Sequence, residues 1–244
     1  MNENISLVTS RKPADVAAVS PSLICMDLCN LEQGVKVLER AGCKMLHVDI
    51  LDGYFSPSMP IGVDTVKQLK EKTSLTYDVH IMAMQNDFFV DEMVGIGAER
   101  ICFHVETERH ICKKLSQIRT AGLKAGVALT PATPIGTIEY ALELCDFVLL
   151  MRINPGYASM PGADQYDFVT RKMYDLSETI VRRGLDTTIT VDGRVYFENV
   201  EEQVCAGLDT VVAGTSSIFS RGGDVKTNFD RLQKLIGQGL QARG

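Results

Sequence analysis

The hydrophobic pattern of the chain alternates between two kinds of segment. Short runs rich in Val, Ile and Leu are typical of buried strands, and between them apolar residues recur at the spacing of amphipathic helices. Thr133 as N-cap and Pro134 at the first helical position indicate where one helix begins. The pattern predicts strands over residues 16–24, 45–50, 75–82, 100–105, 124–129, 147–153, 187–192 and 210–213. It predicts helices over residues 31–41, 63–72, 87–95, 109–121, 134–144, 198–206 and 229–236, and one more that ends near residue 183.

Eight strands, each followed by a helix, predict a single-domain α/β protein with the TIM (β/α)8 barrel fold. The length of 244 residues is close to the ~250 that is typical of such barrels. An open doubly wound sheet would alternate in the same way, but no Gly-x-Gly-x-x-Gly follows the first strand, and eight units are present. We therefore expect an N-terminal extension over residues 1–17 and a barrel domain over residues 18–240.

Composition and charge narrow the classes of function. The net charge of −6 offers no basic footprint for nucleic acid, so we expect no nucleic-acid partner. No apolar run is long enough to span a membrane and residues 1–20 lack the apolar core of a secretory signal, which predicts a cytoplasmic protein without a membrane partner. The seven cysteines are scattered without a Cys-x-x-Cys pair, so we expect reduced thiols and no thiolate metal site.

Metal-capable side chains recur where the predicted strands end. His47 and Asp49 are two residues apart in an apolar run, a spacing that places both on one face of a strand. His80 and Asp192 end two further strands, and active sites of TIM barrels are built at the C-terminal ends of the strands. Two imidazoles and two carboxylates without thiolate suit one divalent ion such as Zn²⁺, Fe²⁺, Mn²⁺ or Co²⁺. The pattern predicts a metal site made of His47, Asp49, His80 and Asp192.

A phosphate site is indicated at the same C-terminal end of the barrel, after the last two predicted strands. Gly214, Thr215 and Ser216 follow the eighth strand, and Gly193 follows the seventh. Barrels often bind a phosphate at this place, through backbone N–H groups and the N-terminus of a short helix. We therefore expect a small phosphorylated substrate rather than a macromolecule.

Five segments resemble, in chain order, the signature segments of the ribulose-phosphate 3-epimerase family. The similarity extends from about residue 21 to about residue 219 and so covers the whole barrel. The segments are His47-Val48-Asp49-Ile50-Leu51-Asp52-Gly53, Asp78-Val79-His80-Ile81-Met82, Asn154-Pro155-Gly156-Tyr157, Val191-Asp192-Gly193 and Ala213-Gly214-Thr215-Ser216.

The resemblance implies a metal-dependent isomerase that inverts C3 of a ketose phosphate by two-base 1,1-proton transfer through a metal-stabilised enediolate. It implies that Asp49 and Asp192 are the catalytic acid and base, one on each face of the substrate, as well as metal ligands. It also implies a homo-oligomer. The substrate-binding residues that it implies are Ser22, His80, Met82, Met151, Gly156, Gly193, Arg194, Gly214, Thr215 and Ser216.

Four departures from the family pattern leave the substrate open. Arg194 stands where a second glycine is usual, and Arg152 stands where a small polar residue is usual. The loop over residues 154–165, which we interpret as a lid, lacks the usual paired glycines. Residues 25–28 resemble the allulose-6-phosphate 3-epimerase branch, so the substrate is either ribulose 5-phosphate or allulose 6-phosphate.

Two alternatives to this enzyme remain. The altered lid and Arg194 are compatible with a barrel of altered specificity, or with one that binds metal and a sugar phosphate without turnover. A barrel lyase or phosphate synthase is the other, but it would leave the convergence of His47, His80 and Asp192 unexplained.

Overall fold

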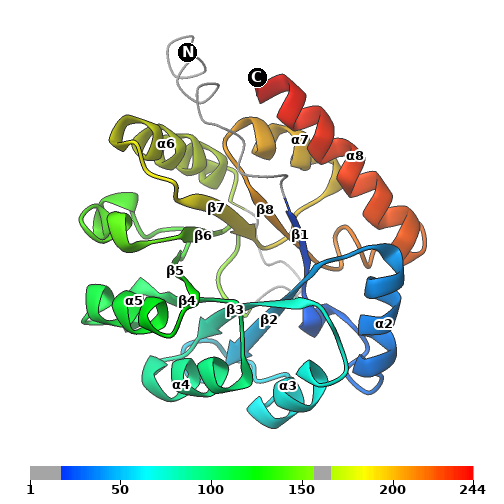
Figure 1. Cartoon of the computed structure of the whole chain (residues 1–244). Coiled ribbons are helices and arrows are strands. Elements are labelled where there is room, and N and C mark those ends of the chain that lie inside the picture. Colours follow the sequence, from blue (N-terminus) through cyan, green and yellow to red (C-terminus); the bar gives the residue numbers. More distant parts are fainter. Residues whose placement is uncertain (1–17, 157–165, 244) are drawn as a thin grey trace.

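The computed structural model describes residues 18–156 and 166–243, and the expected extension over residues 1–17 and most of the expected lid lie outside them. Eight parallel strands form one sheet that closes into the predicted barrel, with helices around it (Figure 1). The strands are β1 (Ala18–Pro21), β2 (Met45–Leu51), β3 (Thr76–Met82), β4 (Arg100–His104), β5 (Lys124–Leu129), β6 (Phe147–Met151), β7 (Thr188–Asp192) and β8 (Thr210–Ala213).

Helices cover the outer face of the barrel, where Val, Ile and Leu side chains from alternate strand positions pack against their apolar stripes. In the described ranges the helices are α2 (Leu31–Ala41), α3 (Val63–Lys70), α4 (Asn86–Ile96), α5 (Ile111–Thr120), α6 (Phe168–Arg183), α7 (Phe197–Cys205) and α8 (Val225–Arg243). Short 3-10 helices are η1 (Leu23–Cys25), η2 (Val105–Thr107), η3 (Ile135–Ile138) and η4 (Ala141–Leu144). None of the helices within these ranges is long and apolar enough to cross a bilayer.

The predicted helix over residues 134–144 is wrong, because this segment forms η3 and η4 instead of one α-helix. Pro134 keeps an extended conformation with ψ of 149° and itself precedes the first helical residue. The Thr133 hydroxyl does not cap a helix, since it contacts Glu106 and Thr130. Gly136, which is a poor helix former, follows directly. Thr133 and Pro134 therefore mark a turn, in which the Thr133 hydroxyl contacts Glu106 after β4.

The first strand is also shorter than predicted, and this shapes the site. β1 ends at Pro21, and the chain turns into η1 directly after Ser22. Strands β1 and β2 share no regular ladder, and a single bridge between Ser22 and His47 joins them. The barrel therefore closes at one of the predicted metal ligands.

The interior of the barrel is divided between polar and apolar halves. A buried cluster of Cys102, Ala128, Phe147, Leu149, Met151 and Ile153 fills the side of β4, β5 and β6. On the side of β1, β2 and β3 the strands bury the polar residues Ser20, His47, Asp49, Asp78 and His80. Burying so many polar groups is costly unless each has a partner, which indicates that this half is built for function.

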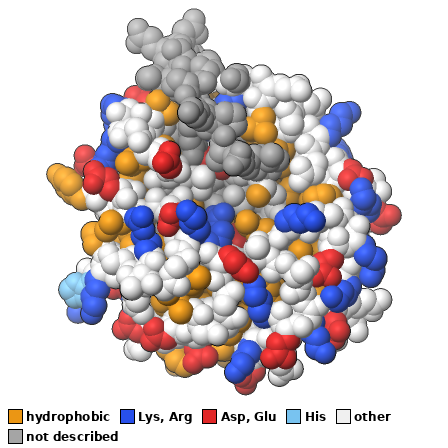
Figure 2. All heavy atoms as spheres, in the orientation of Figure 1, with side chains coloured by type: hydrophobic (Ala, Val, Ile, Leu, Met, Phe, Trp, Pro, Cys, Tyr) orange, Lys and Arg blue, Asp and Glu red, His pale blue; other side chains and the backbone are white. Residues whose placement is uncertain are grey.

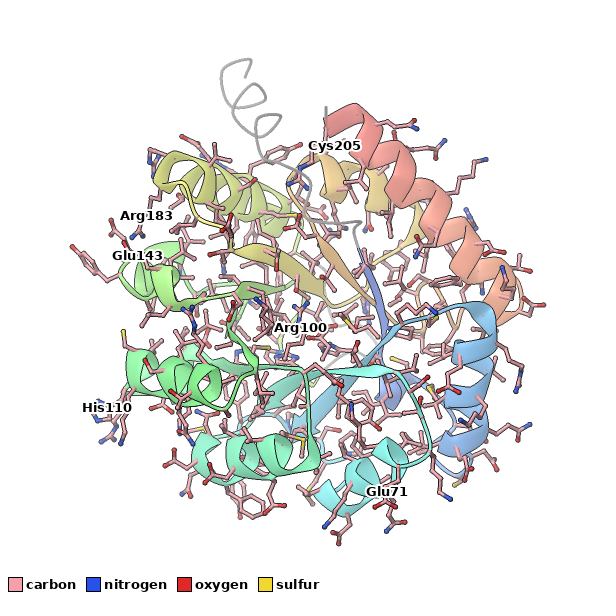
Figure 3. All side chains as sticks on the ribbon, viewed as in Figure 1. Glu71, Arg100, His110, Glu143, Arg183 and Cys205 are labelled. Atoms are coloured by element: carbon pink, nitrogen blue, oxygen red, sulfur yellow. The ribbon has the colours of Figure 1, made fainter. Side chains whose placement is uncertain are left out.

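Charges on the face seen in Figure 2 are mixed in sign, with Lys and Arg side chains interspersed with Asp and Glu. Arg100, at the start of β4, lies near the centre of the barrel in Figure 3. A pocket of about 510 Å³ opens beside it, but its cations already have partners. Lys124 pairs with Asp146 at 3.1 Å, and the Arg119 guanidinium donates to the carbonyl of Leu144. Glu143, Asp146 and Asp186 also line this pocket, so it offers little net positive charge for an anion.

Candidate active site

The four predicted metal ligands lie together at the C-terminal ends of their strands. His47 and Asp49 come from β2, His80 from β3 and Asp192 from β7. Parallel pairing places Asp49 beside His80, and strand alternation turns all four side chains into the barrel. One ligand atom from each residue lies within 4.8 Å of the others.

The spacing of these atoms fits a small divalent ion. His47 Nε2 lies 3.3 Å from Asp49 Oδ1, and His80 Nδ1 lies 3.5 Å from Asp49 Oδ1 and 3.6 Å from Asp192 Oδ2. Ligands about 2.1 Å from a tetrahedral metal would be about 3.4 Å from one another. Both nitrogens are buried and form no hydrogen bond among the described residues, which is costly unless they hold a cation or a proton. The residues present therefore fit the predicted ion.

The electrostatics of the metal-free cluster favour ionised carboxylate. Burial alone would raise the pKa of Asp49, but His47 and His80 outweigh it and hold this pKa far below its usual range. Burial alone would lower the pKa of His47, but the charges of Asp49 and Asp78 raise it well above its usual value. A proton therefore occupies the cluster where a cation would bind, and metal binding should release it.

Asp78, at the middle of β3, supports His47 from behind. Its Oδ2 lies 2.9 Å from His47 Nδ1 and accepts from the Ser20 hydroxyl at 3.1 Å. Its Oδ1 lies 2.8 Å from Nε of Arg100, whose guanidinium stacks 3.8 Å above the ring of Phe147. Burial would raise the pKa of Asp78, but Arg100 and His47 lower it to about 2, so it stays ionised. An ionised Asp78 can only accept, which leaves Nε2 of His47 free to face the metal position.

His80 has a different support, formed by a second histidine. Nε2 of His80 lies 2.9 Å from Nε2 of His104, and Nδ1 of His104 lies 3.1 Å from Oε2 of Glu106. Burial lowers the pKa of His104 to about 4, so it is neutral near pH 7. Burial would raise the pKa of Glu106, but His104 and Thr133 lower it to about 2. These three residues form a continuous chain away from the metal position.

A pocket of about 240 Å³ opens above the cluster and is lined by all but one of the residues predicted to bind substrate. Asp49 and Asp192 reach its floor, whereas His47 and His80 are fully buried beneath it. His80 therefore does not line the pocket, and its predicted contact with substrate stays a prediction. The pocket is lined by Ser22, Met82, Met151, Gly156, Gly193, Arg194, Gly214, Thr215 and Ser216, among others.

The two carboxylate oxygens of Asp49 have different partners at the pocket floor. The Ser22 hydroxyl donates to Oδ2 of Asp49 at 2.8 Å, while Oδ1 of Asp49 faces the two histidine nitrogens. Met82, Met151 and Ile153 are almost fully buried and form an apolar wall beside the carboxylates. Such a wall keeps water out and strengthens electrostatic interactions in the site.

The residues predicted to bind phosphate include backbone of unusual conformation. Gly193 has φ of 101°, and a Cβ there would lie 2.7 Å from Ile153, so only glycine fits. Arg194 has φ of 50° and is the one non-glycine residue with positive φ in the described ranges. A left-handed conformation explains why glycine is usual at position 194. After β8, the described backbone over residues 215–219 forms turns, not the expected helix N-terminus.

Gly156 abuts the loop after β2 and allows a first test. With φ of 79°, a Cβ at Gly156 would lie 1.4 Å from the Ser56 hydroxyl. We expect Gly156→Ala to displace this loop and to lower kcat/KM by about tenfold to a hundredfold. Gly53→Ala is the matched control, because Gly53 has φ of 75° with nothing within 4 Å of a Cβ. Steady-state kinetics should show Gly53→Ala close to the wild type. Adding Ser56→Gly to Gly156→Ala should recover part of the lost kcat/KM. Equal losses of kcat/KM in both glycine variants would contradict a specific role for the contact between Gly156 and Ser56.

Arg152, whose role the sequence left open, is buried and lies outside the pocket lining. Its guanidinium lies 3.5 Å from Asp167 Oδ1, and its backbone N–H donates to the Asp192 carbonyl at 2.7 Å. Arg152 therefore pairs with an acid. Residues 157–165 of the expected lid lie outside the described residues.

Sequence reasoning missed several residues of the site. Cys25, Ser58 and Ile153 line the pocket, and burial raises the pKa of the Cys25 thiol. Glu106 and His104 were also missed, although the alternation of Cys102, His104 and Glu106 repeats the strand-end pattern of β2 and β3. That repeated pattern is the signal that could have found them.

The chain is similar to known epimerases over most of its length. A model of the ribulose-phosphate 3 epimerase family matches residues 18–219. The chloroplastic ribulose-5-phosphate-3-epimerase of Arabidopsis thaliana is 36% identical over 203 residues, which cover 82% of this chain and 71% of the relative. The ribulose-phosphate 3-epimerase of Methanocaldococcus jannaschii is 36% identical over 222 residues, which cover 91% and 92%.

Solved structures of lower identity share the fold. The 3-hexulose-6-phosphate synthase from Salmonella typhimurium superposes with a TM-score of 0.66 at 13% identity, covering 91% of this chain and 99% of that one. The thiamine phosphate pyrophosphorylase from Pyrococcus furiosus gives 0.59 at 13% identity, covering 92% and 97%. These similarities support the barrel fold alone. The family model and the relatives at 36% identity establish that this chain belongs to the ribulose-phosphate 3-epimerase family and is an isomerase.

Proposed function

We propose that this protein inverts C3 of a ketose phosphate by moving protons between two carboxylates, with one divalent metal ion bound by His47, Asp49, His80 and Asp192. The observation that carries the proposal is the convergence of these four ligands beneath a pocket whose floor exposes both carboxylates. A site that only bound a sugar phosphate would not need two carboxylates at the same floor. The proposal therefore favours turnover over binding alone.

The chain's own residues supply the proton transfers. Asp49, ionised at neutral pH, is placed to remove the C3 proton from one face of the substrate, and Asp192 delivers a proton to the other face. The Ser22 hydroxyl holds Oδ2 of Asp49 in place through its hydrogen bond. When bound, the divalent ion would act as a Lewis acid toward the charge that develops on the substrate oxygens. Two groups on opposite faces give inversion, whereas one group would return the proton to its own face.

The phosphate of the substrate is assigned to the opposite end of the pocket. Gly193, Gly214, Thr215 and Ser216 bring backbone close to that end, and Arg194 adds positive charge. A ketose with a terminal phosphate would be oriented by these contacts at its two ends.

Ribulose 5-phosphate is the first candidate substrate, because the Arabidopsis thaliana relative bears its name and other relatives at 36% identity are named for ribulose phosphate. Allulose 6-phosphate is the second candidate, because Cys25 lies in the segment that departs from the usual pattern and also lines the pocket. The expected cytoplasmic location and the expected homo-oligomer remain predictions.

A coupled epimerase assay tests the proposal. The protein is stripped with a chelator, reloaded with Zn²⁺, Fe²⁺, Mn²⁺ or Co²⁺, and supplied with ribulose 5-phosphate or allulose 6-phosphate. We expect turnover of one ketose only in the reloaded protein and a loss of at least about a hundredfold after chelation. Asp49→Asn measured in parallel controls for contaminating epimerase. No turnover of either ketose, with one metal bound per chain, would contradict the proposal.

A further inference from the structure

His80 is the proposed ligand that a second histidine supports. Its Nε2 lies 2.9 Å from Nε2 of His104, which in turn approaches Glu106 with Nδ1 at 3.1 Å. His47 differs, because it contacts the carboxylate of Asp78 directly. The proposed catalytic steps use neither His104 nor Glu106. Their position behind His80 nevertheless allows them to orient this proposed ligand.

We propose that Glu106 and His104 are positioning residues that fix the ring tautomer of His80, so that its Nδ1 carries the lone pair that binds the metal. The inference rests on the proposed function only for the metal site. It assigns no proton transfer to substrate to either residue. The argument for it is the direction in which each hydrogen bond must run.

Glu106, at the far end of the chain of contacts, sets the direction of the hydrogen bonds. A carboxylate has no proton to give, so Nδ1–H of His104 donates to Glu106. With its one proton on Nδ1, the imidazole of His104 has a lone pair on Nε2, which accepts. The 2.9 Å contact between the two Nε2 atoms therefore carries the proton of His80. When a metal is bound, His80 would be protonated at Nε2 only and would present an unprotonated Nδ1 on the side of Asp49 and Asp192, where the metal position lies.

Glu106 is anchored so that it keeps this direction. Its Oε1 accepts from the backbone N–H of Thr130 at 2.9 Å and from the Thr133 hydroxyl, both in the loop after β5. The ring of Phe55 lies 4.7 Å from the ring of His104 and limits its rotation. The relay thus joins the loops after β2, β4 and β5 to one metal ligand.

Glu106→Gln tests the relay, because the side chain keeps its shape but gains a donor. With its oxygen accepting from Thr130 and Thr133, its NH2 group faces Nδ1 of His104 and opposes donor with donor. We expect Zn²⁺ affinity, measured by competition with a chelator, to fall about 10-fold to 100-fold. The visible spectrum of the Co²⁺-loaded protein should change. Nitrogen NMR of the rings should show His104 protonated at Nδ1 in the wild type and at Nε2 in the variant.

Thr133→Val is the matched control, since it removes one hydrogen bond to Glu106 but leaves its charge. It should keep the wild-type cobalt spectrum and an affinity within about threefold. Thermal unfolding of each metal-free variant checks that the barrel is intact. Because Glu106 acts through His104, Glu106→Gln should have little further effect on affinity in a His104→Ala background.

Three results would overturn the relay. They are an unchanged cobalt spectrum and affinity in Glu106→Gln, additive losses in the double variant, and a proton on Nε2 of His104 in the wild type. These readouts do not depend on turnover. A wild-type protein that binds metal through this relay but epimerises neither ketose would contradict the proposed function and leave the relay supported.

Discussion

Asp192→Asn is expected to abolish net epimerisation, with kcat lowered by about 10²-fold to 10⁴-fold, while exchange of the C3 proton with solvent survives for one of the two epimers. Asp192 ends β7, with its side chain 17% exposed at the floor of the pocket. Asparagine keeps the shape and an oxygen ligand but cannot carry a proton between substrate and solvent. Asp49 remains ionised and can still remove the proton on its own face. The measurement is epimerase turnover together with deuterium incorporation at C3 in D2O.

Asp49→Asn provides the matched control for this prediction. It should also abolish net epimerisation, but exchange should survive for the opposite epimer, because the remaining carboxylate lies on the other face. Metal content of both variants must be measured, since each residue is also a proposed ligand. Retained epimerisation in Asp192→Asn would refute the two-base assignment, and so would exchange of both epimers in one variant.

The position of each ligand follows from strand geometry that the sequence already contains. A spacing of two residues in His47 and Asp49 predicts one shared face, and the structure turns both into the barrel. His80 lies beside Asp49 because β2 and β3 are parallel and in register. Short runs rich in Val, Ile and Leu were sufficient to predict eight strands, since a barrel strand is buried on its outer face by helices.

Other features depend on contacts that no local pattern encodes. Thr133 and Pro134 have the chemistry of a helix start, yet the Thr133 hydroxyl is engaged by Glu106 from the preceding unit of the barrel. The alternation of Cys102, His104 and Glu106 marks a strand end, but it does not specify the 2.9 Å contact of His104 with a residue 24 positions earlier. The bridge between Ser22 and His47 likewise depends on closure of the whole sheet. Propensity is overridden wherever such long-range polar contacts decide the local conformation.

Burying polar side chains in one half of the barrel interior costs folding free energy, and the proposed metal site explains why they are there. Asp78 and His47 are fully buried and the side chain of Arg100 is 12% exposed, and the carboxylate of Asp78 contacts both of the others. An apolar filling like that beside β5 and β6 would be at least as stable. The buried charges instead hold one metal ligand at a fixed angle. Stability and metal affinity should therefore fall together when this group is disrupted.

Asp78→Ala is expected to lower the free energy of unfolding of the metal-free protein by about 3–5 kcal/mol, because it leaves the Arg100 guanidinium buried without its carboxylate. It also removes the acceptor of His47 Nδ1, so Zn²⁺ affinity should fall about 10-fold to 100-fold. Denaturant unfolding in the presence of a chelator measures the first effect. Competition with a chromogenic chelator measures the second.

Two further variants separate charge from volume at Asp78. Ser20→Ala removes only one hydrogen bond to Asp78 and should cost about 1 kcal/mol with little change in metal affinity. Adding Arg100→Met to Asp78→Ala should recover part of the stability, because no unpaired charge remains buried, but it should leave metal affinity low. If the double variant is less stable than Asp78→Ala, the loss comes from the cavity and not from the charge. If Asp78→Ala binds Zn²⁺ as tightly as the wild type, His47 does not need this carboxylate to present Nε2 to the metal.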